Sequence, residues 1–152
     1  MLEEGDKAPA FKAEDQFGNT IRLSDFKGKK VILYFYPDDD TPTCTEEACN
    51  LRDNFSLLKK KGFVILGVSP DDVRSHQKFA GKFNLPFSLL ADPERKIIEA
   101  YGCWAKKKLF GHEYMGVLRT TFIIDEKGKI ERIIRKVHSK KHTEQIMANN
   151  PA

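Results

Sequence analysis

The sequence of 152 residues has few cysteines, no long hydrophobic run and no strong surplus of either charge. Three cysteines are too few, and odd in number, for the disulfide framework that holds many small secreted proteins together. The longest apolar runs, 31–36 and 63–68, are far shorter than a membrane span. The 26 basic and 22 acidic residues leave a net charge of +4, and the basic residues are scattered. We therefore expect the protein to bind neither a membrane nor nucleic acid.

The N-terminal residues also differ from those of a secretion signal. Glu3, Glu4 and Asp6 stand where a signal peptide carries basic residues, and no apolar segment follows them. We therefore expect a cytoplasmic protein, in which a cysteine is more often reactive or buried than paired. The length and the 40% hydrophobic content fit a single domain over residues 1–152.

The hydrophobic pattern predicts strands and helices in alternation. The runs 31–36 and 63–68 are rich in β-branched and aromatic residues, which is typical of strands buried on both faces. The spacing of Leu51, Phe55 and Leu58 predicts a helix between them. The predicted helices cover about 43–61, 72–83, 92–101 and 143–149, and the other predicted strands form a hairpin over 10–22 and cover 88–91, 119–125 and 130–137.

This order of elements predicts an α/β fold with a central mixed β-sheet flanked by helices. The early strands should be parallel because helices connect them, and the last two should form an antiparallel hairpin around Gly128. The outline fits a thioredoxin-like fold with an N-terminal β-hairpin.

The loop after the first buried strand leads to the strongest candidate for chemistry, Cys44. In open α/β sheets, sites form at the carboxyl ends of strands, where this loop lies. Cys44 is in the first turn of the next predicted helix, where unpaired N–H groups and the helix dipole favour an anion. A thiolate is the nucleophilic form of cysteine, so Cys44 is the candidate nucleophile. The alternative is a structural cysteine, because Cys44 shares the apolar stripe of the helix with Leu51.

Cys49 lies five residues further on, about 140° around the predicted helix. Two cysteines this close suggest a redox pair, but their spacing differs from the C-x-x-C of thioredoxin-type exchange. A zinc site would need a second pair of ligands, and His138 with His142 is the only candidate. We interpret both histidines as surface residues.

The motif Pro37-x-x-x-Thr41-x-x-Cys44 resembles the active-site signature of the peroxiredoxins, which are thiol peroxidases of thioredoxin-like fold. The spacing of Cys44 and Cys49 is similar to that of the peroxiredoxin Q, or bacterioferritin-comigratory protein, subgroup. Thr43 departs from this subgroup, which commonly has glycine there.

Other segments support the same resemblance. Residues 5–11 and 23–29 are similar to segments near the start of these proteins. Residues 116–125 resemble the strand that carries the family's active-site arginine, which is Arg119 here. The resemblance extends over about residues 5–148.

The resemblance implies a role for each of these residues. Cys44 would attack hydrogen peroxide or an organic hydroperoxide and become a sulfenic acid. Cys49 would condense with that sulfenic acid into an intramolecular disulfide, which thioredoxin or a similar dithiol would reduce. Arg119 would stabilise the thiolate and contact the peroxide, Thr41 would bridge substrate and sulfur, and Pro37 would stiffen and shield the loop. No cofactor and no metal is needed.

Helix geometry adds a condition to this disulfide. On one regular helix the Cα atoms of Cys44 and Cys49 would be roughly 8–9 Å apart. A disulfide tolerates at most about 7 Å between Cα atoms. The first turns of the helix would therefore have to unwind before the bond could form.

Two other functions remain open: a general disulfide oxidoreductase and a non-catalytic thioredoxin-fold binding module. Peroxide consumption that is lost in Cys44→Ser would distinguish the peroxidase from both. We expect a monomer or a weak homodimer. Cys103 stands where the subgroup has an apolar residue, and its neighbour Trp104 and the apolar segment around it predict a buried free thiol.

Overall fold

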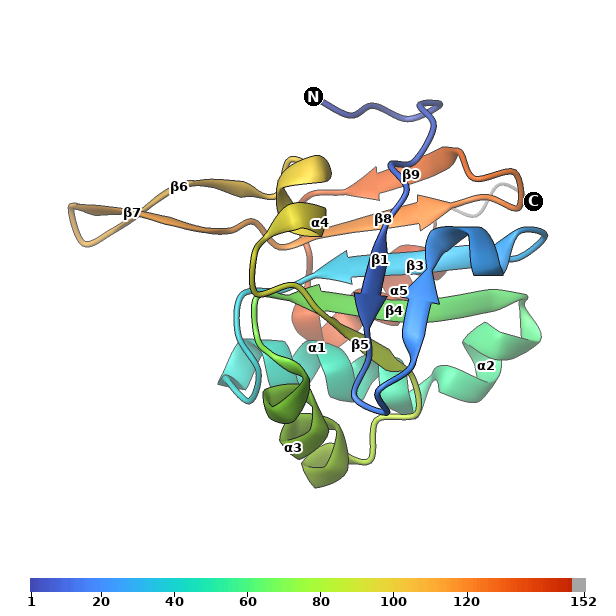
Figure 1. Cartoon of the computed structure of the whole chain (residues 1–152), viewed down its shortest axis with the longest axis horizontal. Coiled ribbons are helices and arrows are strands. Elements are labelled where there is room, and N and C mark those ends of the chain that lie inside the picture. Colours follow the sequence, from blue (N-terminus) through green and yellow to red (C-terminus); the bar gives the residue numbers. More distant parts are fainter. Residues whose placement is uncertain (149–152) are drawn as a thin grey trace.

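Five strands form the central sheet of the structure, a computed structural model that describes residues 1–148 (Figure 1). In spatial order the strands are β5 (Ser88–Ala91), β4 (Phe63–Ser69), β3 (Lys30–Phe35), β8 (Thr120–Ile124) and β9 (Ile130–Ile134). β3 is parallel to β4, and β4 to β5, whereas β8 is antiparallel to both β3 and β9. The predicted mixed sheet is confirmed, with its parallel part first and its antiparallel hairpin last.

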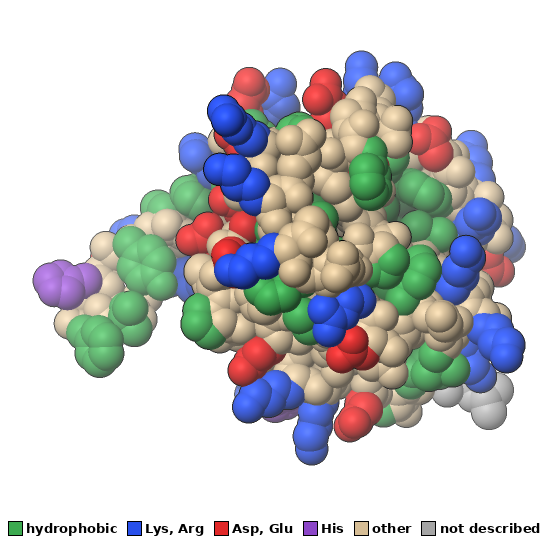
Figure 2. All heavy atoms as spheres, turned by 90° about the horizontal axis from the view of Figure 1, so that it is seen from below, with side chains coloured by type: hydrophobic (Ala, Val, Ile, Leu, Met, Phe, Trp, Pro, Cys, Tyr) green, Lys and Arg blue, Asp and Glu red, His purple; other side chains and the backbone are tan. Residues whose placement is uncertain are grey.

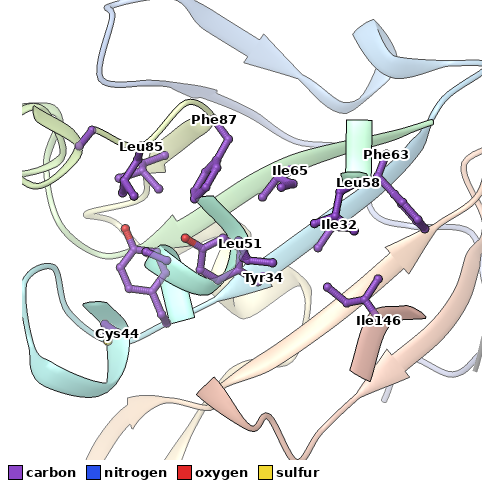
Figure 3. Close-up of a cluster of buried hydrophobic side chains, with 14 of the residues drawn as sticks. Ile32, Tyr34, Cys44, Leu51, Leu58, Phe63, Ile65, Leu85, Phe87 and Ile146 are labelled. Atoms are coloured by element: carbon purple, nitrogen blue, oxygen red, sulfur yellow. The ribbon is translucent and has the colours of Figure 1, made fainter. Parts of the chain in front are cut away.

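Helices cover both faces of this sheet, as the sequence predicts. Alternate residues of β3 point to opposite faces, so Ile32 and Tyr34 belong to one buried cluster and Leu33 and Phe35 to another. Figure 3 shows the first cluster, which includes Cys44. It is covered by α1 (Pro42–Asp53), α2 (Phe55–Lys60), α3 (Val73–Phe83) and α5 (His142–Ala148), and the second by α4 (Lys96–Ala100).

The N-terminal hairpin is also confirmed. β1 (Lys12–Glu14) pairs antiparallel with β2 (Thr20–Arg22), and Ala13 and Ile21 pack against the second cluster. A short 3-10 helix, η1 (Leu23–Phe26), follows β2 and leads to the central sheet.

The helix predicted over 43–61 is wrong in one respect, because α1 and α2 are separate helices with Asn54 between them. The backbone of Asn54 has φ −110° and ψ 13°, and its side-chain amide donates to the carbonyl of Asn50 at 2.8 Å. Asparagine side chains compete in this way with the backbone hydrogen bonds of a helix. Asn54 therefore ends α1 before α2 begins.

The boundaries of three other elements also differ from the prediction. α4 begins at Lys96 rather than near residue 92, because Arg95 has a left-handed backbone with φ +61°. β9 ends at Ile134, before the predicted 137. A 3-10 turn, η2 (Ser139–Lys141), precedes α5, which begins at His142; residue 149 of the predicted helix lies outside the described residues.

A second hairpin, of β6 (Trp104–Leu109) and β7 (His112–Val117), is absent from the sequence-based prediction. It projects from the body of the molecule in Figure 1. Figure 2 shows hydrophobic side chains on this projection, and Leu109, Phe110, Tyr114 and Met115 are exposed there. No helix within residues 1–148 is long and apolar enough to cross a membrane.

Candidate active site

Cys44 lies in the first turn of α1, immediately after the loop that leaves β3. Thr41 is the N-cap of this helix, and Pro42 occupies its first position, where no N–H is needed. The first helical hydrogen bond runs from the amide of Thr45 to the carbonyl of Thr41 at 2.8 Å. The amides of Thr43 and Cys44 therefore have no acceptor within the helix, and they make its N-terminus favourable for an anion.

Arg119 meets Cys44 because β8 lies beside β3 in the sheet. Arg119 immediately precedes β8, and Cys44 follows the loop after β3. The two residues are 75 positions apart in the sequence, but the pairing of β3 with β8 makes their side chains neighbours. The Nη2 atom of Arg119 donates to the Sγ atom of Cys44 at 3.0 Å. Cys44 is 1% exposed, whereas the side chain of Arg119 is 23% exposed. A permanent cation thus contacts a sulfur that is almost fully shielded from water, which stabilises the thiolate form.

A buried carboxylate, Asp39, holds the loop between β3 and α1 in place. Its Oδ1 atom accepts a hydrogen bond from the hydroxyl of Tyr36 at 2.6 Å, and its Oδ2 atom accepts one from Ser75 at 2.8 Å. Oδ2 also lies 2.7 Å from Nδ1 of His76, which is fully buried on α3. The Asp39 amide donates to Asp71 at 2.9 Å. These contacts fix the approach to Cys44, and the sequence analysis missed both Asp39 and His76.

Pro37, Asp40 and Thr41 also belong to the loop between β3 and α1. Pro37 is half-buried at the start of the loop, and Asp40 has a left-handed backbone with φ +59°, a strained conformation for this residue. Within residues 1–148 the Thr41 hydroxyl donates to the carbonyl of Asp38 at 3.2 Å, and it makes no hydrogen bond to Cys44.

Cys49 shares α1 with Cys44 and is half-buried. All three cysteines of the chain are free thiols in this structure. α1 is continuous from Pro42 to Asp53. The Cα atoms of Cys44 and Cys49 are therefore about 8–9 Å apart, as helix geometry predicts.

Cys103 lies on the opposite face of the sheet, in the second buried cluster. It is 2% exposed, and its thiol contacts the carbonyl of Tyr101 at 3.6 Å. Burial raises the pKa of the Cys103 thiol to about 11. The prediction that Cys103 is a buried free thiol is confirmed.

The interpretation of His142 as a surface residue is wrong, although His138 is exposed as expected. His142 is 0% exposed, and its Nε2 atom lies 2.8 Å from the hydroxyl of Thr121 and 3.5 Å from Oε2 of Glu47. The reason is that α5 packs on α1 and turns His142 inward on the same face as Ile146. This i, i+4 spacing is the signal in the sequence that could have indicated burial.

Glu47, one helical turn after Cys44, is also fully buried, and the sequence analysis missed it. Its Oε1 atom lies 3.5 Å from Nη1 of Arg119. Burial raises the pKa of Glu47 to about 8, against the opposing effect of the Arg119 charge. Burial lowers the pKa of His142 to about 4. Both side chains are therefore mostly uncharged near neutral pH.

A surface cavity of about 390 Å³ lies beside Arg119 and opens to solvent. It is lined by Lys107, Leu118, Arg119, Thr120, Arg135, Lys136 and Val137. This cavity can admit a small molecule to the arginine that contacts Cys44. A larger hollow of about 590 Å³ lies elsewhere, between the first hairpin and α2, and no cysteine lines it. Among residues 1–148 no group of three His, Cys, Asp or Glu side chains is placed to hold a metal ion.

The chain is similar in sequence and fold to known peroxiredoxins. Residues 4–133 match the AhpC/TSA family. The chain is 48% identical to peroxiredoxin Bcp of Bacillus subtilis over 96% of this chain and 93% of that protein. It is 41% identical to peroxiredoxin Bcp of Escherichia coli over 96% and 94%. The bacterioferritin comigratory protein of Xanthomonas campestris, studied for alkyl peroxide reduction, superposes with a TM-score of 0.88 at 29% identity, covering 96% of each chain.

Proposed function

Because this chain belongs to the AhpC/TSA family and is a thiol-dependent peroxidase of the Bcp and peroxiredoxin Q group, we propose that Cys44 is the sulfur that attacks peroxide. One observation carries this assignment: the Arg119 guanidinium contacts the Cys44 sulfur at 3.0 Å, at the start of a helix. Cys49 and Cys103 have no comparable contact with a cation among residues 1–148.

The first step transfers one oxygen atom to sulfur. The Cys44 thiolate attacks the terminal oxygen of a hydroperoxide, an S–O bond forms, and the O–O bond breaks. The sulfur is oxidised to a sulfenic acid, and the peroxide is reduced. The second oxygen leaves with the bonding electron pair, as hydroxide from hydrogen peroxide or as an alkoxide from an organic hydroperoxide, and takes a proton from water.

Arg119 and the helix N-terminus stabilise the charge that moves in this step. Negative charge passes from the sulfur to the leaving oxygen, so a donor that reaches both positions lowers the barrier. Arg119 has five N–H donors, and only Nη2 is used on Cys44 while Nη1 is 3.5 Å from Glu47. The free amides of Thr43 and Cys44 supply further donors at the same place.

Thr41 and Pro37 complete the proposed site. The Thr41 hydroxyl can leave the Asp38 carbonyl and donate to a bound peroxide, since a hydroxyl rotates freely about its bond. Pro37 offers no N–H to water and restricts the backbone of the loop. The buried Asp39 then fixes the position of the whole segment.

Cys49 resolves the sulfenic acid in our proposal. Its thiol attacks the Cys44 sulfur, a disulfide forms, and the sulfenic oxygen leaves as water. A dithiol such as thioredoxin then reduces the Cys44–Cys49 disulfide and is itself oxidised to a disulfide. We place this cycle in the cytoplasm, in a monomer or a weak homodimer, with no cofactor and no contact with nucleic acid or membrane.

A peroxidase assay tests this proposal against the two alternatives. Wild-type protein with a dithiol should consume hydrogen peroxide and an organic hydroperoxide, and Cys44→Ser should consume neither. Cys103→Ser is the matched control, because Cys103 lies on the other face of the sheet and should not be required. Reduction of insulin disulfides without peroxide consumption would instead indicate a disulfide oxidoreductase, and neither activity would indicate a binding module.

A further inference from the structure

A buried acid and a buried imidazole lie directly behind Arg119, and the peroxidase cycle described above uses neither of them. Glu47 and His142, here called the Glu47–His142 pair, are both 0% exposed, with Oε2 and Nε2 3.5 Å apart. The pair continues a chain of contacts that starts at the thiol, from Cys44 to Arg119 at 3.0 Å and from Arg119 to Glu47 at 3.5 Å. α5 is thereby connected to the reacting sulfur.

The hydrogen bonds of Gln145 fix which nitrogen of His142 carries a proton. The Oε1 atom of Gln145 accepts from the amide of His138 at 2.8 Å, and its Nε2 atom donates to the carbonyl of Lys136 at 2.7 Å. The orientation of this amide is therefore determined by its partners. Oε1 also lies 3.0 Å from Nδ1 of His142, so Nδ1 must donate. In the neutral imidazole, Nε2 is then an acceptor.

The second carboxylate oxygen of Glu47 faces this acceptor. Within residues 1–148, Oε2 of Glu47 has no hydrogen-bond partner, and a buried carboxylate oxygen without a donor is costly. A proton on Oε2 removes the charge of this carboxylate, to which the acceptor Nε2 of His142, 3.5 Å away, offers no N–H. The hydroxyl of Thr121, 2.8 Å away, donates to the lone pair of this nitrogen, so Nε2 is held as an acceptor. Both members of the pair are thus uncharged, with one proton on Oε2 of Glu47 and one on Nδ1 of His142.

The surroundings of the pair add few charges of their own. Tyr34 is fully buried, and burial raises its pKa well above the ordinary value, so it stays neutral. Arg132 points away, to the carbonyls of Gln145 and Ile146 at 3.1 and 2.8 Å. The other titratable and charged groups on the elements packed around the pair are Cys44, Glu46, Cys49, Arg52 and Asp53 on α1, Lys30 and Tyr34 on β3, Arg119 before β8, Glu131 and Arg132 on β9, Lys140 and Lys141 in η2, and Glu144 on α5.

We propose that His142 is a positioning residue for peroxide reduction, which keeps a proton on Glu47 and so leaves the charge of Arg119 to the Cys44 sulfur. The inference rests on the proposed function, in which Cys44 is the attacking sulfur. If Glu47 were ionised, its carboxylate would compete with the thiolate for the same guanidinium and repel the thiolate as a like charge. His142 prevents this by presenting its acceptor nitrogen, and no N–H, to the Glu47 carboxylate.

The proposal predicts a particular pH dependence. Both members of the pair are uncharged between the pKa of His142, about 4, and that of Glu47, about 8. Above pH 8, Glu47 becomes a carboxylate beside Arg119. We expect the rate constant for peroxide attack to fall by about tenfold between pH 7 and pH 9, equivalent to about 1.4 kcal/mol in the barrier.

Two variants and one control test this with stopped-flow kinetics. Glu47→Gln cannot ionise, so its rate constant should show no decline between pH 7 and pH 9. His142→Gln places an amide N–H where Nε2 accepts, which favours the carboxylate and should move the decline to lower pH. Ile146→Val, on the same face of α5, is the control for packing and should keep the wild-type profile.

A second readout concerns His142 itself and does not depend on peroxide chemistry. Nitrogen-15 NMR of the imidazole at pH 7 should show the neutral tautomer with the proton on Nδ1. An imidazolium at pH 7, or the tautomer protonated on Nε2, would overturn the proposal, and so would wild-type pH profiles in both Glu47→Gln and His142→Gln. Failure of the peroxidase function would instead leave no attack rate to measure in any variant, while the tautomer would remain as stated.

Discussion

Oxidation should unfold the helix that carries both reactive thiols. Cys44 and Cys49 lie on one continuous helix, with Cα atoms roughly 8–9 Å apart, whereas a disulfide allows about 7 Å at most. Forming the bond must therefore break helical hydrogen bonds between them. We expect this change to extend beyond α1, because the C-terminal segment is held on the same stretch of helix.

The cost of this unwinding follows from the contacts that α1 would lose. Asn50 donates to the carbonyl of Lys140 at 2.9 Å and accepts from the amide and hydroxyl of Thr143 at 2.8 and 2.7 Å. Glu46 accepts from the hydroxyl of Ser139 at 2.9 Å. At a net value of about 1 kcal/mol for each hydrogen bond, these four contacts stabilise the docked segment by about 4 kcal/mol.

Hydrogen–deuterium exchange with mass spectrometry measures this directly. One equivalent of peroxide should raise amide exchange in residues 42–53 and 139–148, by up to about a thousandfold where 4 kcal/mol of protection is lost. Strand β4, inside the sheet, should be unchanged. Cys49→Ser treated in the same way is the control, because it cannot form the disulfide and should keep its protection. A peptide map that shows the 44–49 disulfide while exchange in both segments is unchanged would refute the reasoning.

Three further predictions follow from the same contacts. Arg119→Met should slow peroxide attack at pH 7 by about a hundredfold or more in stopped-flow measurements, the loss typical of a donor to a developing anion; an unchanged rate would remove Arg119 from the site. Cys49→Ser should react with the first equivalent of peroxide at the wild-type rate and then overoxidise Cys44 to sulfinic or sulfonic acid, seen by intact mass; stable turnover with a dithiol would argue against Cys49 as the resolving thiol. The folded protein holds the Glu47 proton up to about pH 8, whereas an unfolded carboxyl releases it near pH 4.5, so wild-type stability in urea should fall by about 2 kcal/mol from pH 6.5 to pH 8. His142, depressed to about 4, adds little slope in that window, and equal slopes for wild type and Glu47→Gln would contradict the assignment.

Much of the fold is predictable from the sequence because its strongest signals are local. The continuous apolar runs of β3 and β4 have no other stable place than a strand covered on both faces. The β6–β7 hairpin gives no such signal, because Lys106, Lys107 and Lys108 run through it and its apolar tip is exposed. The break at Asn54 depends on one side chain turning back on the helix, which periodicity does not report.

The site also has one part that the local sequence predicts and another that depends on the tertiary structure. The position of Cys44 at a helix start follows from the chain near it, but its contact with Arg119 depends on the pairing of β3 with β8. The resemblance to a known motif supplied that partner, and spacing alone did not. Glu47 gives no signal of burial because acids are usually exposed, and for His142 the one signal is its i, i+4 spacing with Ile146; the docking of α5 on α1 is what buries the two side chains together.

The most direct test of the central claim is to locate the sulfenic acid. Cys49→Ser, treated with one equivalent of hydrogen peroxide and a sulfenic-acid-specific reagent such as dimedone, keeps Cys44 and Cys103 as its only thiols. Peptide mass spectrometry should find the label on Cys44, which contacts Arg119, and none on Cys103, which is buried with a pKa raised to about 11. Label on Cys103, or rapid peroxide consumption with no label on Cys44, would contradict the account.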